Sequence, residues 1–118
     1  MYPLLGLLRK SKIVRDVAVL NFVDEEDIQV FHGKAVLIDD SLLFIRELAT
    51  TVDSKYSYHW QRKSGKLICR WDNAPYHPSV KTFPHHKHEG KQENVLPTEE
   101  ITLEVVLNAI ERRIAMKR

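Results

Sequence analysis

The segment "KYSYHWQRKSGKLICRWD", residues 55–72, gives the clearest indication of the fold. Two segments rich in aromatic and aliphatic residues flank Ser64 and Gly65, a pattern typical of a β-hairpin. If this pair forms a symmetric turn, Lys63 lies opposite Lys66, and side chains alternate between the two faces of the hairpin from there. The register therefore predicts one aromatic face and one polar face.

The aromatic face of this hairpin is expected to be core. The register places Tyr58 opposite Trp71 and Trp60 opposite Cys69, with Tyr56 on the same face. Aromatic side chains bury large areas when they face a core. Cys69 would then be an inert buried thiol. As the single cysteine of the chain it cannot form an internal disulfide, which favours a reducing, cytoplasmic compartment.

The polar face receives three pairs: Ser57 opposite Asp72, His59 opposite Arg70, and Gln61 opposite Ile68. Cross-strand partners lie about 5 Å apart at Cβ, so His59, Arg70 and Asp72 are expected to converge. An imidazole beside an arginine keeps a lowered pKa and can act as a base, and arginine can hold a phosphate with two parallel hydrogen bonds. The alternative is a solvent-facing ladder in which Asp72 pairs with Arg70.

Residues 13–22, 28–38 and 41–49 predict three further strands before the hairpin, because they are rich in β-branched and alternating apolar residues. Asp39 and Asp40 suit a tight turn between the second and third of them. Five strands that follow one another in this way predict an antiparallel meander.

The remaining segments predict one edge strand and two helices. Residues 82–88 are expected to return as an edge strand after a proline-rich run that leaves the sheet. Pro3 and the leucines after it predict a short N-terminal helix. A C-terminal helix, capped by Thr98 or Thr102, is predicted by the spacing of Leu103, Val106, Leu107, Ile110 and Ile114. We therefore expect one α+β domain over residues 1–118, with a meander sheet of five or six strands and the C-terminal helix packed on it.

Charge is unevenly distributed along the chain. The net charge is +2, but residues 55–88 contain seven basic side chains and one acidic side chain, Asp72. A basic, aromatic-rich stretch suits a partner that carries phosphate, and the alternative is a solvated basic face. No segment reaches the roughly 20 apolar residues that cross a bilayer, so we expect no membrane insertion.

The range 70–88 also contains four of the six histidines: His77, His85, His86 and His88. A three-histidine metal site, with Asp72 or Glu89 nearby, is one interpretation. Structural zinc sites usually bring cysteines at recognisable spacings, and these are absent from the sequence. We therefore expect no metal ion and no cofactor.

Acid–base catalysis without a metal is the preferred interpretation of these histidines. Two histidines near a phosphodiester could activate the ribose 2′-hydroxyl and protonate the leaving 5′-oxygen. The candidates are His59 or His86 as general base and His88 or His85 as general acid, with Asp72 and His77 in the same catalytic set. Arg70 and Lys87 would stabilise the transition state. The other expected substrate contacts are Lys66, Asn73 and Lys81; Asn73 also suits a purely structural turn.

The segment "KYSYHWQRKSGKLICRWDNAPYHPSVKTFPHHKHEG" and the later "ITLEVVL" resemble the TumE-type toxin family of prokaryotic toxin–antitoxin modules. The resemblance is strong over residues 55–90 and continues through the C-terminal helix. It implies a small cytoplasmic toxin neutralised by an antitoxin, often a helix-turn-helix DNA-binding protein. Where the family usually has a second histidine before His77, this chain has Tyr76.

These observations lead to a functional hypothesis, a metal-independent endoribonuclease toxin. Three rival hypotheses stay open: a metal-dependent nuclease that uses the loop histidines, a non-catalytic RNA-binding module, and a component that binds only proteins. A homodimer is also compatible with the sequence.

Overall fold

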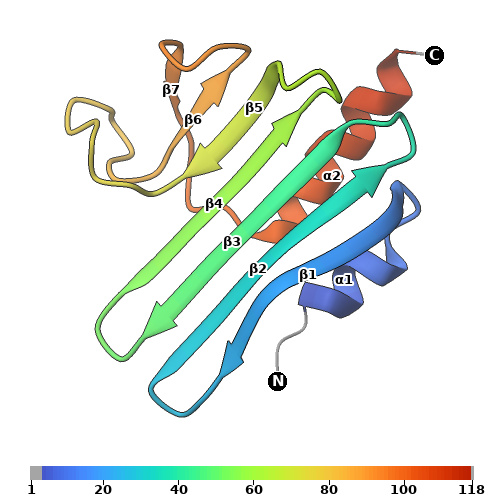
Figure 1. Cartoon of the computed structure of the whole chain (residues 1–118). Coiled ribbons are helices and arrows are strands. Elements are labelled where there is room, and N and C mark those ends of the chain that lie inside the picture. Colours follow the sequence, from blue (N-terminus) through green and yellow to red (C-terminus); the bar gives the residue numbers. More distant parts are fainter. Residues whose placement is uncertain (1–3, 118) are drawn as a thin grey trace.

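Seven strands form one antiparallel sheet in which they are ordered as in the sequence (Figure 1). The computed structural model describes residues 4–117. The elements are α1 (Leu4–Lys10), β1 (Val14–Asp24), β2 (Ile28–Leu37), β3 (Leu42–Thr50), β4 (Ser54–Gln61), β5 (Leu67–Asp72), β6 (His86–Glu89), β7 (Val95–Pro97) and α2 (Leu103–Met116). The predicted α+β meander with two helices is confirmed. Pro3, expected at the start of the first helix, lies outside the described residues.

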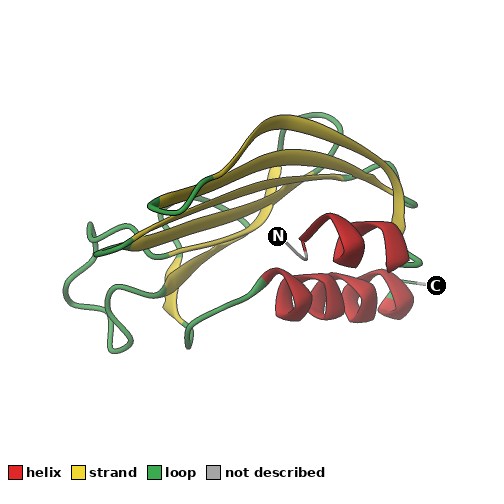
Figure 2. Ribbon diagram, turned by 90° about the horizontal axis from the view of Figure 1, so that it is seen from below, coloured by secondary structure: helices red, strands yellow, loops and turns green. Residues whose placement is uncertain are grey.

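Both helices cover the same face of the sheet (Figure 2). The five apolar residues whose spacing predicted α2 are all buried, and Thr102 caps the helix by accepting a hydrogen bond from the Val105 amide. We call the opposite side of the sheet the open face; it carries the side chains of Lys34, Phe44, His59 and Arg70.

The strand count is a correction to the sequence analysis. Five or six strands were expected, with residues 82–88 at the edge, but β7 pairs with β6 and forms the edge itself. A strand of three residues is too short to show alternation in a sequence. It also ends at Pro97, which an edge position tolerates because no further ladder bond is needed there.

The turn between β4 and β5 is a second correction. The Arg62 amide donates to the Lys66 carbonyl at 2.8 Å, and Gly65 adopts a φ of 98°, so the loop has three residues instead of two. Gln61 consequently pairs with Leu67 and not with Ile68. A bulge follows at once and restores the expected pairing from Trp60 opposite Cys69 onward.

The core lies between the sheet and the helices. Tyr56, Tyr58, Trp60 and Trp71 are buried there, which confirms the aromatic face of the hairpin. Cys69 is fully buried among them, as predicted, and burial raises the pKa of its thiol to about 12, which disfavours the reactive thiolate. None of the helices in residues 4–117 is long and apolar enough to cross a membrane.

Candidate functional site

Two rows of side chains cross the open face, because the register stays aligned from β2 to β6. One row is His32, Arg46, Ser57, Asp72 and His86, and the other is Lys34, Phe44, His59, Arg70 and His88. The predicted pairs of Ser57 with Asp72 and of His59 with Arg70 are confirmed. Strand β6 adds two histidines beside them.

Arg70 links the two rows. Its Nε donates a hydrogen bond to Asp72 Oδ2 at 3.0 Å, and its Nη1 donates to His59 Nδ1 at 3.2 Å. A guanidinium has five N–H donors in a fixed plane, and these two bonds hold that plane in one orientation. Three donors have no further partner within the described part of the chain. Arg70 is therefore oriented in advance for an anionic ligand.

His59 is neutral in this arrangement. A guanidinium can only donate, so Nδ1 accepts from Arg70, and Nε2 carries the proton that it donates to Gln61 Oε1 at 3.1 Å. Burial, and after it the charge of Arg70, lower the pKa of His59, although the bond to Gln61 acts in the opposite direction. His59 supports the orientation of Arg70 with its own lone pair.

This lowered pKa gives a testable pH dependence. The unfolded chain takes up a proton at His59 as the pH falls through the ordinary value of 6.5, whereas the folded chain resists until a lower pH. The stabilisation that neutral His59 contributes is therefore fully present above pH 6.5. It is lost as the pH falls from there through the lowered pKa of His59 in the folded protein. We expect the wild-type free energy of unfolding to fall more steeply between neutral and mildly acidic pH than that of His59→Gln, measured by urea denaturation. Parallel profiles for the two proteins would contradict the assignment.

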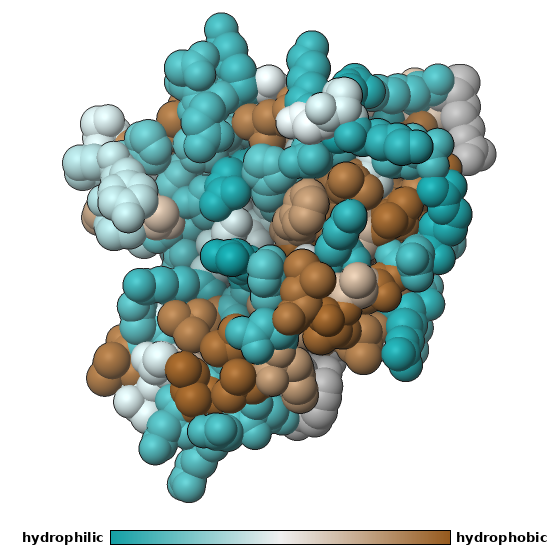
Figure 3. Space-filling model, viewed as in Figure 1, coloured by the Kyte–Doolittle hydropathy of each residue, from teal (hydrophilic) through white to brown (hydrophobic). Residues whose placement is uncertain are grey.

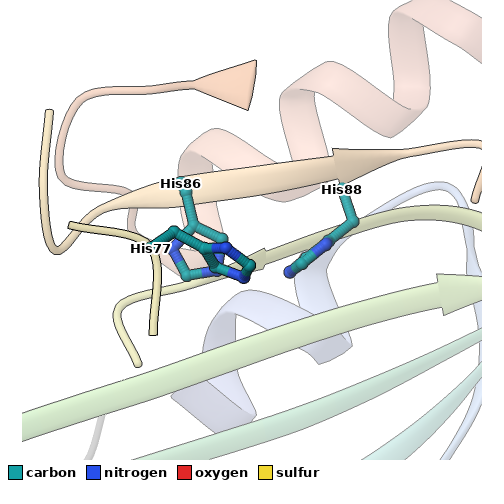
Figure 4. A group of neighbouring side chains, drawn as sticks. All are labelled: His77, His86 and His88. Atoms are coloured by element: carbon teal, nitrogen blue, oxygen red, sulfur yellow. The ribbon is translucent and has the colours of Figure 1, made fainter. Parts of the chain in front are cut away.

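Three histidines meet beside Arg70 and Asp72 (Figure 4). His86 and His88 point from β6 toward His77, which lies in the loop over residues 73–85, and the nitrogens nearest one another lie within 4.8 Å. The ring centroids are 4.7 Å apart for His77 and His86, 5.5 Å for His77 and His88, and 4.9 Å for His86 and His88, all edge to face. We call His77, His86 and His88 the histidine triad.

Asp72 is the buried carboxylate beside the triad; its side chain is 6% exposed. Oδ1 accepts a hydrogen bond from the Ala74 amide at 3.0 Å and also lies 3.0 Å from His86 Nε2. Oδ2 faces Arg70 and lies 3.6 Å from His88 Nε2. The carboxylate thus supplies negative charge to Arg70 and to the triad at the same time.

A cleft of about 590 Å³ adjoins these groups, and among its lining residues are Lys55, Ser57, Arg70, Asp72, Asn73, His77, His86 and His88. His59 is not among the described residues that line it. Figure 3, drawn from the open face, shows hydrophilic residues over the strands and loop of this region and apolar residues gathered over the first three strands. The cleft is large enough for a small ligand or for part of a nucleotide chain.

The structure does not bring every candidate residue into the cleft. His85 lies apart from the triad: its Nδ1 is 2.8 Å from the Tyr56 hydroxyl and its ring stacks on that side chain. Lys87 alternates to the helix-covered face, where its Nζ is 3.9 Å from Glu89 Oε1. Lys66 and Lys81 are not among the described residues that line the cleft.

Asn73 lines the cleft in a structural role. Its Oδ1 accepts a hydrogen bond from the Tyr56 amide at 2.9 Å, and its Nδ2 donates to the Ser54 carbonyl at 2.8 Å. Both ends of the side-chain amide therefore fix the start of the loop to β4.

Arg46 and Lys34 are open-face cations that the sequence analysis did not select. Arg46 is exposed in the same row as Asp72, and Lys34 Nζ lies 5.9 Å from the Phe44 ring centroid in the row of Arg70. The alternation of β2 and β3, continued across the hairpin, is the signal that could have placed both residues on this face.

The fold and this site define a small α+β protein with a histidine-lined cleft at one end of its sheet. A protein-family model described as toxin TumE matches residues 4–114, so the chain belongs to the TumE toxin family. Membership indicates the toxin component of a toxin–antitoxin module and implies a cognate antitoxin as partner. Comparison with curated proteins and with solved structures gave no match.

Proposed function

We propose that this toxin is an endoribonuclease and that the cleft around Arg70 is where it cleaves RNA. The observation that supports this most is the orientation of the Arg70 guanidinium by two fixed acceptors, Asp72 and His59, beside three histidines. A planar cation with available donors suits a phosphodiester, and the histidines suit activation of a hydroxyl.

The open face provides a path for the RNA backbone. Arg46 and Lys34 lie in the two rows that lead across the sheet to Arg70 and Asp72. Positive side chains along such a path attract phosphates and give a salt-dependent affinity. Phe44, beside His59 with ring centroids 6.2 Å apart, offers an apolar surface for a base.

The reaction we infer is attack of a ribose 2′-hydroxyl on the neighbouring phosphorus. A bond from O2′ to phosphorus forms while the bond from phosphorus to O5′ breaks. A histidine of the triad accepts the 2′-proton as general base, and a proton from solvent goes to O5′. Arg70 stabilises the extra negative charge on the phosphate oxygens. His77 is half-buried, whereas His86 and His88 are buried, so His77 is the member of the triad nearest to solvent and substrate.

The test is incubation of purified protein with labelled RNA of mixed sequence, with and without EDTA, followed by identification of the new 3′ ends. We expect cleavage that leaves 2′,3′-cyclic phosphates. Cleavage that survives EDTA would support the metal-independent acid–base mechanism predicted from the sequence, and cleavage that EDTA abolishes would make the triad a metal site. Intact RNA without EDTA would contradict the proposed function.

A further inference from the structure

Two members of the triad, His86 and His88, have the hydrogen bonds that are typical of metal-binding histidines. His86 Nδ1 lies 2.9 Å from the Pro84 carbonyl oxygen, and His88 Nδ1 lies 2.8 Å from the Gln92 carbonyl oxygen. A carbonyl oxygen can only accept, so Nδ1 carries the proton in both rings. In the neutral rings Nε2 then carries the lone pair, and a backbone carbonyl behind the ring is the usual support for a metal ligand.

The lone pair on His86 Nε2 has no hydrogen-bond donor among the described residues. Its Nε2 is buried and has no hydrogen-bond partner in the described part of the chain, although Asp72 Oδ1 lies 3.0 Å away. A lone pair that faces a carboxylate oxygen is repelled by it, and a buried polar atom without a partner is costly. The position therefore calls for a positive species close to both atoms.

Either a proton or a metal ion could supply this charge, and the convergence of three rings favours the ion. A proton on His86 Nε2 would pair that nitrogen with Asp72, but it would not account for the convergence of His77 and His88 on the same point. One divalent ion satisfies three nitrogens at once, and Asp72 offsets part of its charge.

We propose that His77, His86 and His88 bind one divalent transition-metal ion, of which zinc is the best fit. Three imidazoles are a known ligand set for zinc with an open coordination position, and imidazole also suits cobalt and nickel. Zinc–nitrogen bonds of about 2.0–2.1 Å in a tetrahedron place the nitrogens about 3.3 Å apart, so the triad must contract from its 4.8 Å limit. His77 comes from a loop, and its side chain can move without disturbing a strand.

This site departs from the sequence-based expectation of no metal ion. It rests on the geometry of the triad and not on RNA cleavage. If the proposed function holds as well, the open coordination position would bind water or a phosphate oxygen next to Arg70.

The experiment is a Co²⁺ titration of tag-free protein freed of metal by dialysis against a chelator, followed by the visible absorption of bound cobalt. We expect one equivalent bound by the wild type and displaced by Zn²⁺. His77→Asn should weaken binding by at least about 10-fold, since loss of even a supporting group behind a ligand costs that much. His32→Asn is the matched control, because it removes a half-buried histidine from the same face outside the triad, and it should bind as the wild type does.

Two results would overturn the proposal: folded wild-type protein that binds no Co²⁺, or equal affinities for wild type and His77→Asn. The His77 side chain makes no hydrogen bond to another described residue, so its replacement should leave the fold intact, as circular dichroism can check. An NMR titration with Zn²⁺ tests the same site without any variant. The ring signals of three histidines should shift while that of His32 does not, and an unchanged spectrum would also overturn the site. No RNA is present in these measurements, so their failure is distinguishable from failure of the endoribonuclease proposal.

Discussion

Replacement of Arg70 by lysine is expected to lower the rate of RNA cleavage by about 10²–10³-fold, the usual effect of removing one preorganised donor from a site of developing negative charge. Lysine keeps the charge but loses the planar group that Asp72 and His59 hold in place. The compact ammonium cannot bond these two acceptors and a phosphate in the same geometry. Cleavage rates on labelled RNA, and growth arrest on expression in cells, measure the effect.

The matched control is Arg62→Lys, in the turn between β4 and β5. Arg62 is exposed and is not among the residues that line the cleft. This variant makes the same chemical change on the same hairpin and should cleave RNA at the wild-type rate. Equal activity of Arg70→Lys and wild type, with both proteins folded, would remove Arg70 from the site.

The hairpin could be predicted from the sequence because its information is local. Alternation within residues 55–72 separates Tyr58 and Trp60 from His59, and burial enforces that separation, since a slip of one residue would turn both aromatic side chains to solvent. The two-residue turn predicted from the sequence was wrong. Gly65 at positive φ belongs to a three-residue loop that shifts the register, and the bulge after it shifts the register back, so the hydrophobic pattern shows neither change.

The sequence indicated that histidines gather in this region, but not which three of them meet in space. His85 and His86 are neighbours in the sequence, yet the pairing of β6 with β5 directs His86 toward Asp72 while His85 stacks on Tyr56. His77 reaches the triad through a loop that has no periodicity from which its position could be read. The geometry of the site therefore depends on tertiary contacts that a single sequence does not display.

Asp72→Asn should destabilise the protein even when no metal ion is present. Asparagine keeps an oxygen for the Ala74 amide but removes the charge that compensates Arg70 at 3.0 Å. Removal of one partner from a buried ion pair costs about 3–5 kcal/mol, and we expect about 3 kcal/mol here because the Arg70 side chain keeps 32% of its exposure. Urea denaturation in buffer with EDTA measures this loss apart from any contribution of an ion.

Asp53→Asn is the control for this change, since Asp53 also lines the cleft but is 54% exposed and lies 3.9 Å from Lys55. Exposed pairs of this kind contribute little, so its unfolding free energy should stay within about 0.5 kcal/mol of the wild type. If Asp72→Asn were as stable as Asp53→Asn, the carboxylate would not compensate Arg70. A lower free energy of unfolding for Asp72→Asn in metal-free buffer would mean that the Asp72 carboxylate stabilises the fold as well as forming part of the site.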